Sequence, residues 1–353
     1  MHTTSIRSRS SRASIASLVL AASAYAAPTS RFDVQYALTP GADPAHQQLD
    51  IYGDTAWTAR PVVIYAHGGC WQNGDKSAVA IKDDAFRDAG YVFVSINYRL
   101  APTGAYPLNA RDVAAAVAWV HRNAATFGAN PFRIVLMGHS AGAHVVSLVA
   151  TDPRYLADEG VPREALEAVI ALDTGAHDLT LFAGTDGVLG GCHGETFGQD
   201  PAVWAEASPI TYAPVPGPTP PFALPYSRGI NPKGFDQHRV IQNQNMAVAL
   251  QAAGVRADLI DGTYTTHSGI NQNFGAPGDP VTEACFTFLA SLAPTCAADT
   301  DSSGTVGFSD ITTVLSNLGA LGSTPLTGDA DSDADVDFSD ITTVLATFGS
   351  ACR

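Results

Sequence analysis

The chain is poor in basic residues and nowhere clusters them. It has 19 Lys and Arg against 34 Asp and Glu, which gives a formal net charge of −15 over 353 residues. Binding to the phosphates of nucleic acid requires clustered Lys and Arg side chains. The composition therefore excludes nucleic acid as a partner. The acidic excess is uneven, because residues 297–353 hold nine Asp and a single Arg.

Long hydrophobic runs are also scarce. Beyond the N-terminus, no apolar run approaches the roughly 18 residues that suggest a membrane-spanning helix. Hydrophobic residues make up 46% of the chain and charged residues 15%, which is typical of a globular protein with a sizeable core. We therefore expect the mature protein to be soluble, with no membrane span.

The N-terminal residues 1–27 have the three parts of a secretory signal peptide. Arg7, Arg9 and Arg12 precede the short apolar segment SIASLVLAASAYA, which ends in small residues. This segment is too short to cross a bilayer. We expect it to direct the protein out of the cell, either into the medium or to the cell surface.

The chain has five cysteines, and cysteines of an exported protein can form disulfides. Cys296 and Cys352 bracket the acidic C-terminal tail, and their pairing would join its two ends. Cys192 and Cys285 form the next candidate pair. Cys70 is then expected to be the free cysteine.

From about residue 31, short apolar runs alternate with stretches of helical spacing. Strands are predicted in QQLDIYG, in residues 61–66, 91–98, 133–137, 166–173 and 220–226, and in VRADLID. Helices are predicted over residues 107–128, 245–254 and 280–292, and directly after Ser140. Alternating strands and helices predict an α/β fold, with a mostly parallel sheet and helices on both faces.

This alternation lapses between Asp173 and Pro220. The segment contains the glycine-rich AGTDGVLGGCHGETFG and the proline-rich APVPGPTPP. We interpret it as an inserted loop over the active face, where substrate selection often resides.

The stretch GHSAG at residues 138–142 directly follows the predicted strand RIVLM. Gly-x-Ser-x-Gly in this setting is a nucleophile elbow, a turn so sharp that only small residues fit beside the serine. Ser140 is therefore the candidate nucleophile.

A serine nucleophile that transfers acyl groups needs N–H donors aimed at the developing oxyanion. The sequence YAHGGCW follows a predicted strand, and its glycines let backbone N–H groups face a cavity. We expect Gly68, Gly69 and Cys70 to form one side of an oxyanion hole. The N–H of Ala141, the residue after the nucleophile, is expected to supply the second donor.

The general base is expected to be a histidine, which can take the serine proton near neutral pH. His267, in TYTTHSGIN, is the histidine that follows the last predicted strand. The acid remains open between two residues. Asp236 has the position expected after the penultimate strand and is the first choice. Asp173, one strand earlier, is the alternative.

Together, HGGCW, NYRLAP, NPFRIVLMGHSAGAH and THSGIN resemble the α/β-hydrolase superfamily, close to its hormone-sensitive-lipase and kynurenine-formamidase-like esterases. The similarity covers roughly residues 45–292. It implies hydrolysis of carboxylic esters, with the HGGxW motif indicating formamidase or feruloyl and acetyl esterase relatives. SRGINPKG after residue 226 departs from the family pattern, in which His-Gly and an Asp commonly follow. An arylformamidase-like amidase and a non-catalytic binding module are the alternatives.

The acidic tail contains an internal repeat. DTDSSGTVGFSDITTVLSNLG and DADSDADVDFSDITTVLATFG are offset by 30 residues and share FSDITTVL. Each opens with oxygen-bearing residues at the spacing of a calcium loop. The candidate ligands are Asp299, Asp301, Ser303, the Thr305 carbonyl, Gly307 through water and Asp310, then Asp329, Asp331, Asp333, the Asp335 carbonyl, Asp337 and Asp340.

An Asp at the twelfth position followed by a single helix, twice, resembles the dockerin type I repeat. The resemblance implies a small C-terminal module of EF-hand-like helices, about two bound Ca²⁺ ions, and a cohesin-like or cell-surface scaffold partner. The expected organisation is a signal peptide (1–27), a catalytic domain (28–292), a linker (293–298) and the calcium-binding module (299–353). Catalysis itself is expected to need no cofactor, and the substrate is expected to be a small or polysaccharide-linked ester.

Overall fold

A computed structural model describes residues 30–54, 57–183, 187–215, 217–229, 237–292, 298–300, 306–321, 327–330 and 335–348. The predicted signal peptide, most of the predicted linker, Cys296 and Cys352 lie outside these residues.

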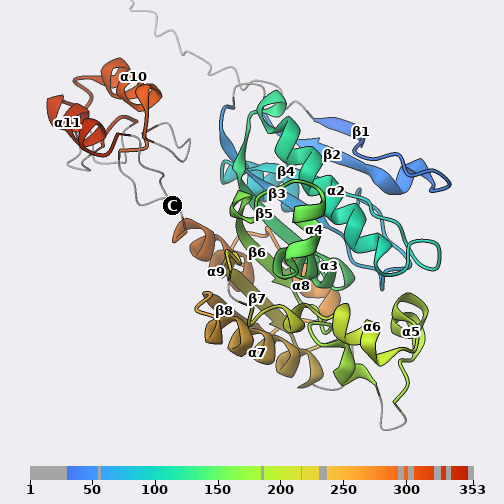
Figure 1. The fold of residues 1–353 in the computed structure, drawn as a ribbon. Helices are drawn as coiled ribbons and strands as arrows, with labels where there is room; N and C mark the ends of the chain where they lie inside the picture. The colour runs from blue at the N-terminus through green and yellow to red at the C-terminus, as the bar shows by residue number, and fades with distance from the viewer. Residues whose placement is uncertain are drawn as a thin grey trace, which may run out of the picture.

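An eight-stranded sheet forms the centre of the fold, in the order β1-β2-β4-β3-β5-β6-β7-β8 (Figure 1). β2 pairs antiparallel with both β1 and β4, and all other neighbouring strands are parallel. The strands are β1 (Arg31–Gln35), β2 (Gln48–Tyr52), β3 (Arg60–Ala66), β4 (Val92–Ile96), β5 (Ala129–His139), β6 (Leu166–Leu172), β7 (Phe222–Ser227) and β8 (Ala257–Gly262). The seven strands predicted from apolar runs are thereby confirmed.

The strand β1 was not predicted from the sequence. It lies at the edge of the sheet, and its residues are exposed or half-buried. An edge strand with one neighbour does not need the continuous apolar run of a buried parallel strand. Its sequence RFDVQ therefore lacks the apolar run by which the other strands were predicted.

Helices cover both faces of the sheet, as the alternation predicted. α2 (Leu108–Asn123), α3 (Ala141–Thr151), α4 (Pro153–Asp158) and α7 (Gln237–Ala252) share one apolar cluster with alternate strand residues such as Val62 and Ile64. α1 (Lys82–Asp88), α8 (His267–Asn273) and α9 (Pro280–Ala290) share the other cluster with Val63 and Tyr65. Successive strand residues point to opposite faces, so a single apolar strand contributes to both clusters.

The segment between β6 and β7 is more regular than the loop we predicted from its glycine and proline content. It contains α5 (Gly191–Phe197) and α6 (Pro201–Glu206), together with 3₁₀ turns at Leu179–Phe182 and Pro209–Thr211. α6 has a recognisable start, because the Asp200 side chain accepts a hydrogen bond from Ala202 N at 2.9 Å and Pro201 follows it. The glycines of GGCHG obscure α5. The insertion is thus partly helical, and α5 and α6 lie together beside the sheet (Figure 1).

The C-terminal region lies apart from the sheet in Figure 1 and has its own small apolar cluster. α10 (Phe308–Asn317) and α11 (Phe338–Ala346) both begin at the repeated FSDITTVL. Val314 and Val344, at matching places in the two repeats, are completely buried in this cluster. A short antiparallel bridge joins Leu321 to Asp335. The described part of each repeat therefore forms one helix, as predicted.

Further short 3₁₀ turns occur at Pro44–Gln47, Ala124–Phe127 and Arg163–Ala165. Within the described ranges, none of the helices is both long enough and apolar enough to span a bilayer.

Candidate active site

Ser140 occupies a sharp turn between β5 and α3, with φ 55° and ψ −117°. The turn brings two backbones so close that only glycine fits on either side. A Cβ on Gly138 would lie 2.4 Å from the carbonyl carbon of Gly142, and one on Gly142 would lie 2.1 Å from the Ala66 oxygen. This geometry is that of a nucleophile elbow, and it explains both glycines of GHSAG.

His267 follows the last strand, β8, as predicted, and is the first residue of α8. Thr266 caps this helix by accepting a hydrogen bond from Gly269 N at 3.1 Å. The Nε2 of His267 lies 3.0 Å from Ser140 Oγ, and its Nδ1 lies 2.6 Å from Asp173 Oδ2. A carboxylate can only accept, so Nδ1 carries the hydrogen and Nε2 is left to accept the serine proton.

Asp173 directly follows β6 and is completely buried. Ser227, at the end of the neighbouring β7, holds its carboxylate from both the backbone and the side chain. Ser227 N donates to Oδ1 at 2.8 Å and Ser227 Oγ donates to Oδ2 at 2.6 Å. Arg239 at the start of α7 donates to the Asp173 carbonyl and lies 3.9 Å from Oδ2. Neither Ser227 nor Arg239 was singled out from the sequence.

These contacts decide the charge of Asp173. Burial by itself would raise the pKa of this carboxyl group, but the hydrogen bond from His267 and the positive charge of Arg239 outweigh burial. The hydrogen bond from Ser227 acts in the same direction, and the net pKa is below its ordinary value. Asp173 is therefore ionised near neutral pH.

Of our two candidate acids, the structure brings the alternative, Asp173, against His267. Asp236 itself lies outside the described residues. Among the described residues, the partners of the two ring nitrogens of His267 are Asp173 on one side and Ser140 on the other. The structure thus favours the alternative, Asp173. It can reach the imidazole because β6 lies next to β5, whose end carries Ser140.

The predicted oxyanion loop, residues 67–73, follows β3 and packs directly on the nucleophile. A Cβ on Gly68 would lie 3.2 Å from the Ser140 Cβ, so the loop backbone approaches the serine as closely as glycine permits. Gly69, Cys70 and Trp71 all have positive φ angles. Among the described residues, no acceptor bonds the N–H groups of Gly69, Cys70 or Ala141. These N–H groups are the candidates for holding an oxyanion.

The cysteine pairing differs from our prediction. Cys70 forms a disulfide with Cys192 of α5, and their Cα atoms are 5.9 Å apart. Cys285 is a free, buried cysteine on α9. The predicted Cys192–Cys285 pair and the free Cys70 are therefore wrong. The sequence separation of 122 residues hid the pairing, since only the folding of the insertion onto the oxyanion loop brings the two cysteines together. The predicted Cys296–Cys352 pair lies outside the described residues.

The two histidines beside the elbow, His139 and His144, have structural roles. His144 Nε2 donates to the Ala207 carbonyl at 2.8 Å, and its Nδ1 accepts from the Trp71 indole at 3.2 Å. The ring of His139 packs against that of His267, and its Nε2 donates to the His267 carbonyl at 3.0 Å. Burial lowers the pKa of His139 to about 3 and that of His144 to about 4, so both rings are neutral.

The C-terminal repeats bring together part of the predicted calcium ligands. Carboxylate oxygens of Asp335, Asp337 and Asp340 all lie within 4.8 Å of one another. Such an all-oxygen donor set fits a hard cation such as Ca²⁺. Asp340 also accepts from Asp337 N at 2.7 Å, and Asp310 accepts from Gly307 N in the same way. Asp301, Ser303, Thr305, Asp331 and Asp333 lie outside the described residues.

The sheet order, the elbow after β5 and the His267–Ser140 contact define the α/β-hydrolase class of proteins. Residues 49–226, half of the chain, match the family BD-FAE, and the chain belongs to that family.

Among curated proteins, the chain is similar to esterase LipC of Mycobacterium tuberculosis, with 31% identity over 64% of this chain and 60% of that protein. It is also similar to the carboxylic ester hydrolase LipN of the same species, with 30% identity over 62% of this chain and 60% of that protein. The chain thus spans about 60% of the length of these two relatives.

Solved structures show the same fold. One is described as a truncated form of carbohydrate esterase from gut microbiota, with a TM-score of 0.59 and 20% identity over 75% of this chain and 96% of that one. Another is esterase B from Lactobacillus rhamnosis, with a TM-score of 0.59 and 22% identity over 75% of this chain and 86% of that one.

Proposed function

We propose that this protein is a carboxylic ester hydrolase that works through an acyl-enzyme on Ser140. The observation that carries the proposal is the line of contacts from Asp173 through His267 to Ser140, at 2.6 and 3.0 Å. Its similarity to LipC and LipN, both esterases, supports the same reaction class.

In the proposed reaction, His267 Nε2 takes the proton of Ser140 Oγ while the oxygen attacks the ester carbonyl. Asp173 keeps the hydrogen of His267 on Nδ1 and stabilises the ring as it becomes positively charged. The N–H groups of Ala141 and of the loop 68–70 hold the developing oxyanion. The protonated His267 then donates to the leaving alcohol, and water hydrolyses the acyl-enzyme by the same steps.

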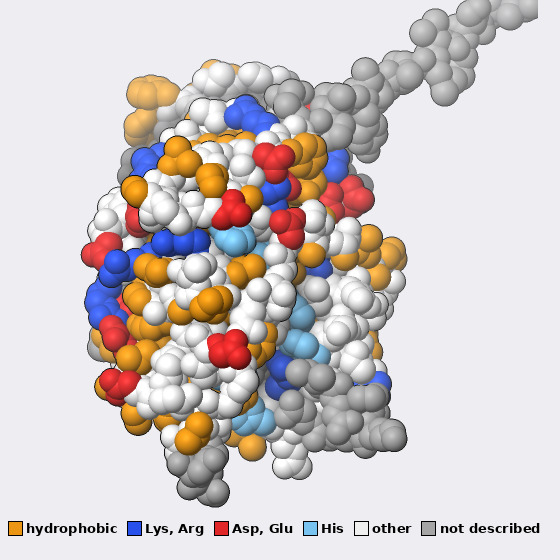
Figure 2. All heavy atoms as spheres, turned by 90° about the vertical axis from the view of Figure 1, so that its right-hand side faces the viewer, with side chains coloured by type: hydrophobic (Ala, Val, Ile, Leu, Met, Phe, Trp, Pro, Cys, Tyr) orange, Lys and Arg blue, Asp and Glu red, His pale blue; other side chains and the backbone are white. Residues whose placement is uncertain are grey.

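We further propose that the ester belongs to a carbohydrate and carries an acetyl or feruloyl group. The HGGxW motif supports this, as does the structural similarity to a protein described as a carbohydrate esterase. Figure 2 views the side on which α5 and α6 lie in Figure 1, and acidic and basic side chains are scattered there rather than gathered. A neutral substrate fits such a surface better than a highly charged one.

Replacing the nucleophile tests the reaction class. Ser140→Ala is expected to lower hydrolysis of p-nitrophenyl acetate more than about 100-fold, since no other group forms the acyl-enzyme. The small side chain fits the elbow, so circular dichroism should show an unchanged fold. Turnover by the variant close to that of the wild type would refute the assignment. A panel of acetyl, feruloyl and formanilide substrates would then separate esterase from amidase specificity.

Export of the protein is also a proposal. The Cys70–Cys192 disulfide supports it, because disulfides persist in oxidising compartments outside the cytosol. Detection of mature protein starting near residue 28 in the medium or on the cell surface would test it.

We also propose that residues 299–353 bind about two Ca²⁺ ions and dock to a cohesin-like or cell-surface scaffold. The clustered carboxylates of Asp335, Asp337 and Asp340 support calcium binding. Exposed apolar residues at matching places in the two repeats, such as Phe308 and Phe338, support docking. Calorimetry with CaCl₂ should show binding that is weakened more by Asp340→Ala than by Asp310→Ala, because the second loop has more carboxylates.

A further inference from the structure

The oxyanion loop has a backbone that its own hydrogen bonds do not fully define. Cys70 and Trp71 have φ angles of 57° and 56°, in the left-handed region that residues with a side chain rarely adopt. Such a conformation persists only where surrounding contacts hold it. Within the loop, Gln72 N and Asn73 N both bond the Gly69 carbonyl, at 3.1 and 2.9 Å. The N–H of Cys70 has no hydrogen bond to the described residues.

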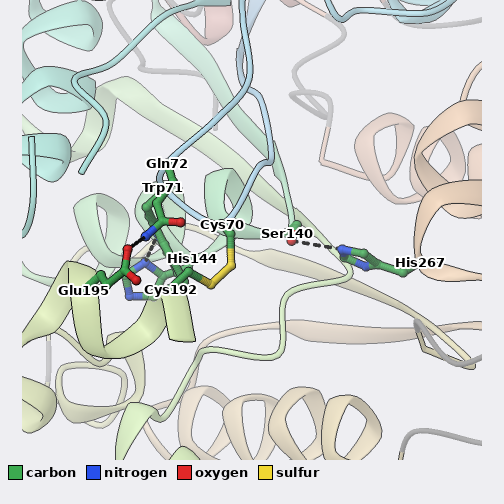
Figure 3. The surroundings of a disulfide bond; sticks show 8 residues. All are labelled: Cys70, Trp71, Gln72, Ser140, His144, Cys192, Glu195 and His267. Atoms are coloured by element: carbon green, nitrogen blue, oxygen red, sulfur yellow. Dashed lines mark hydrogen bonds between the residues drawn. A yellow bond between two sulfur atoms is a disulfide. The ribbon is translucent and has the colours of Figure 1, made fainter. Parts of the chain in front are cut away.

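The contacts that hold the outer side of this loop come from α5 of the insertion (Figure 3). Cys192 forms the disulfide to Cys70, and Glu195 accepts a hydrogen bond from the Gln72 side chain. The helix α5 is thus bonded to Cys70 through a disulfide and to Gln72 through a hydrogen bond. The end of α5 is anchored by the buried Thr196 and Phe197, whereas residues 191–195 are exposed or half-buried. Loss of the disulfide and of the Glu195 bond would therefore leave this first part of the helix less firmly held against the loop.

Trp71, between these two anchors, is held from the same side. Its ring packs edge-on against His193 and Phe197 of α5, with centroids 5.3 and 5.0 Å away. Its indole N–H donates to His144 on α3, which is itself bound to the Ala207 carbonyl of the insertion. Figure 3 shows Cys70 lying between Cys192 on one side and Ser140 on the other.

We propose that Cys192 is a positioning residue for the oxyanion hole. Its disulfide pulls on Cys70, the residue whose N–H is a candidate oxyanion donor, and α5 acts as the support that keeps the strained loop in its active conformation. The protein is therefore a hydrolase whose rate depends on the oxidised state of this single bond. The inference rests on the proposed ester hydrolysis, which it deepens by naming a control of the same site.

The sensitivity of catalysis to donor position makes this effect measurable. Loss of one oxyanion donor costs about 100- to 1000-fold in rate. Displacement of a reacting group by about 1 Å can cost about 100-fold. A loosened Cys70 N–H is therefore expected to lower kcat by about tenfold or more, while KM changes little, since the oxyanion forms only in the transition state.

The test compares full-length wild type with Cys192→Ala, and uses Cys285→Ala as the matched control for removing a cysteine away from the site. Expected are a kcat at least about tenfold lower for Cys192→Ala and an unchanged kcat for Cys285→Ala. The affinity of phenylboronic acid, whose adduct with Ser140 places an oxygen where the oxyanion forms, should fall by a similar factor. A purely structural role would lower thermal stability and leave the kcat of folded protein and the boronate affinity unchanged.

Reduction supplies a second test on protein that is already folded. Two electrons from a dithiol break the Cys70–Cys192 bond, each sulfur takes up a proton, and the dithiol closes to its own disulfide. Reduced wild type should match Cys192→Ala, reoxidation should restore its rate, and Cys192→Ala should not respond to the dithiol.

Full kcat in reduced wild type, with both thiols confirmed by titration, would overturn the proposal, and so would wild-type kcat and boronate affinity in Cys192→Ala. If Cys192→Ala fails to fold, the reduced wild type decides. Boronate binding to Ser140 needs no turnover, so the role of the Cys70–Cys192 disulfide is tested even if no ester proves to be a substrate. Ester hydrolysis that survives in Ser140→Ala would instead refute the proposed function.

Discussion

At the scale of single residues, the site depends on a buried charged group that is stabilised by hydrogen bonds and a nearby positive charge. Asp173 is completely buried, yet it stays ionised because His267, Arg239 and Ser227 stabilise its charge. An unpaired carboxylate at this depth would take up a proton instead. The residues around Asp173 therefore support the proposed reaction by keeping this carboxylate charged.

The choice of acid can be tested by two amide substitutions. Asp173→Asn is expected to lower kcat/KM by several orders of magnitude, about 10⁴-fold, because the amide no longer selects the Nδ1–H form of His267. Asp236→Asn should change kcat/KM by less than about tenfold, and serves as the matched control. Steady-state kinetics on a p-nitrophenyl ester measures both. A crippled Asp236 variant beside an active Asp173 variant would reverse our assignment.

Ser227 gives a finer test of the same network. Ser227→Ala removes the hydroxyl donor to Asp173 Oδ2 and keeps the backbone N–H bond to Oδ1. A hydrogen bond to a charged group is worth about 1.5–3 kcal/mol, so we expect kcat/KM to fall by roughly tenfold or more. The acidic limb of the pH–rate profile should move to higher pH, because Asp173 loses part of what lowers its pKa. Ser227→Thr, which keeps the hydroxyl, is the control, and equal losses in both variants would contradict this role.

At the scale of elements, the neighbouring parallel strands bring the site together. The ends of β5, β6 and β7 place Ser140, Asp173 and Ser227 side by side, and β3 ends in the oxyanion loop. His267 begins α8, so the position of its ring depends on how that helix is anchored. Lys82 at the start of α1 is one anchor. It donates to the Asn271 carbonyl near the end of α8 at 2.5 Å and lies over the Tyr65 ring.

This anchor makes stability depend on pH. Burial lowers the pKa of Lys82 to about 8, from an ordinary value of 10.5. Between these two values the unfolded chain binds more protons than the folded one, so stability rises with pH across this window, by at most about 1.4 kcal/mol per pH unit. Lys82→Met should remove this contribution. The free energy of unfolding, measured with urea, should change between pH 7.5 and pH 9.5 in both proteins. We expect this change to be less favourable for Lys82→Met than for wild type. Identical pH dependence would show that Lys82 stays charged in the fold.

At the scale of the whole molecule, the chain carries two structural parts with separate apolar clusters. The clusters of the sheet and its helices contain residues up to Leu292, and the C-terminal cluster contains residues from Ala298 onward. Every residue of the proposed site comes from the first part. The small core of the second part makes its independent stability marginal, so bound metals or disulfides would stabilise it.

Deleting residues 294–353 tests this division. The truncated protein is expected to keep kcat/KM within about threefold of the full chain, because distant parts with separate cores act independently. Its thermal unfolding should lose any dependence on CaCl₂ that the full chain shows. An inactive truncated protein that still folds, judged by circular dichroism, would mean that the tail takes part in the site.

Local features of the sequence were sufficient to predict most strands of the sheet, the nucleophile and the histidine that contacts it. The apolar runs predicted seven strands, the small residues of GHSAG marked Ser140, and the position after the last strand singled out His267. These signals are local, because a strand buried on both faces must be apolar and a sharp elbow admits only small neighbours. The repeat FSDITTVL likewise predicted two equivalent helices.

The tertiary structure alone decided the rest. Asp173 and Ser227 are 54 residues apart and meet because β6 and β7 pair in the sheet. Cys70 and Cys192 are 122 residues apart and meet because the insertion folds back onto the oxyanion loop. No spacing in the sequence encodes such encounters, since strand order and the path of an insertion follow from the burial of the whole core rather than from the residues that meet.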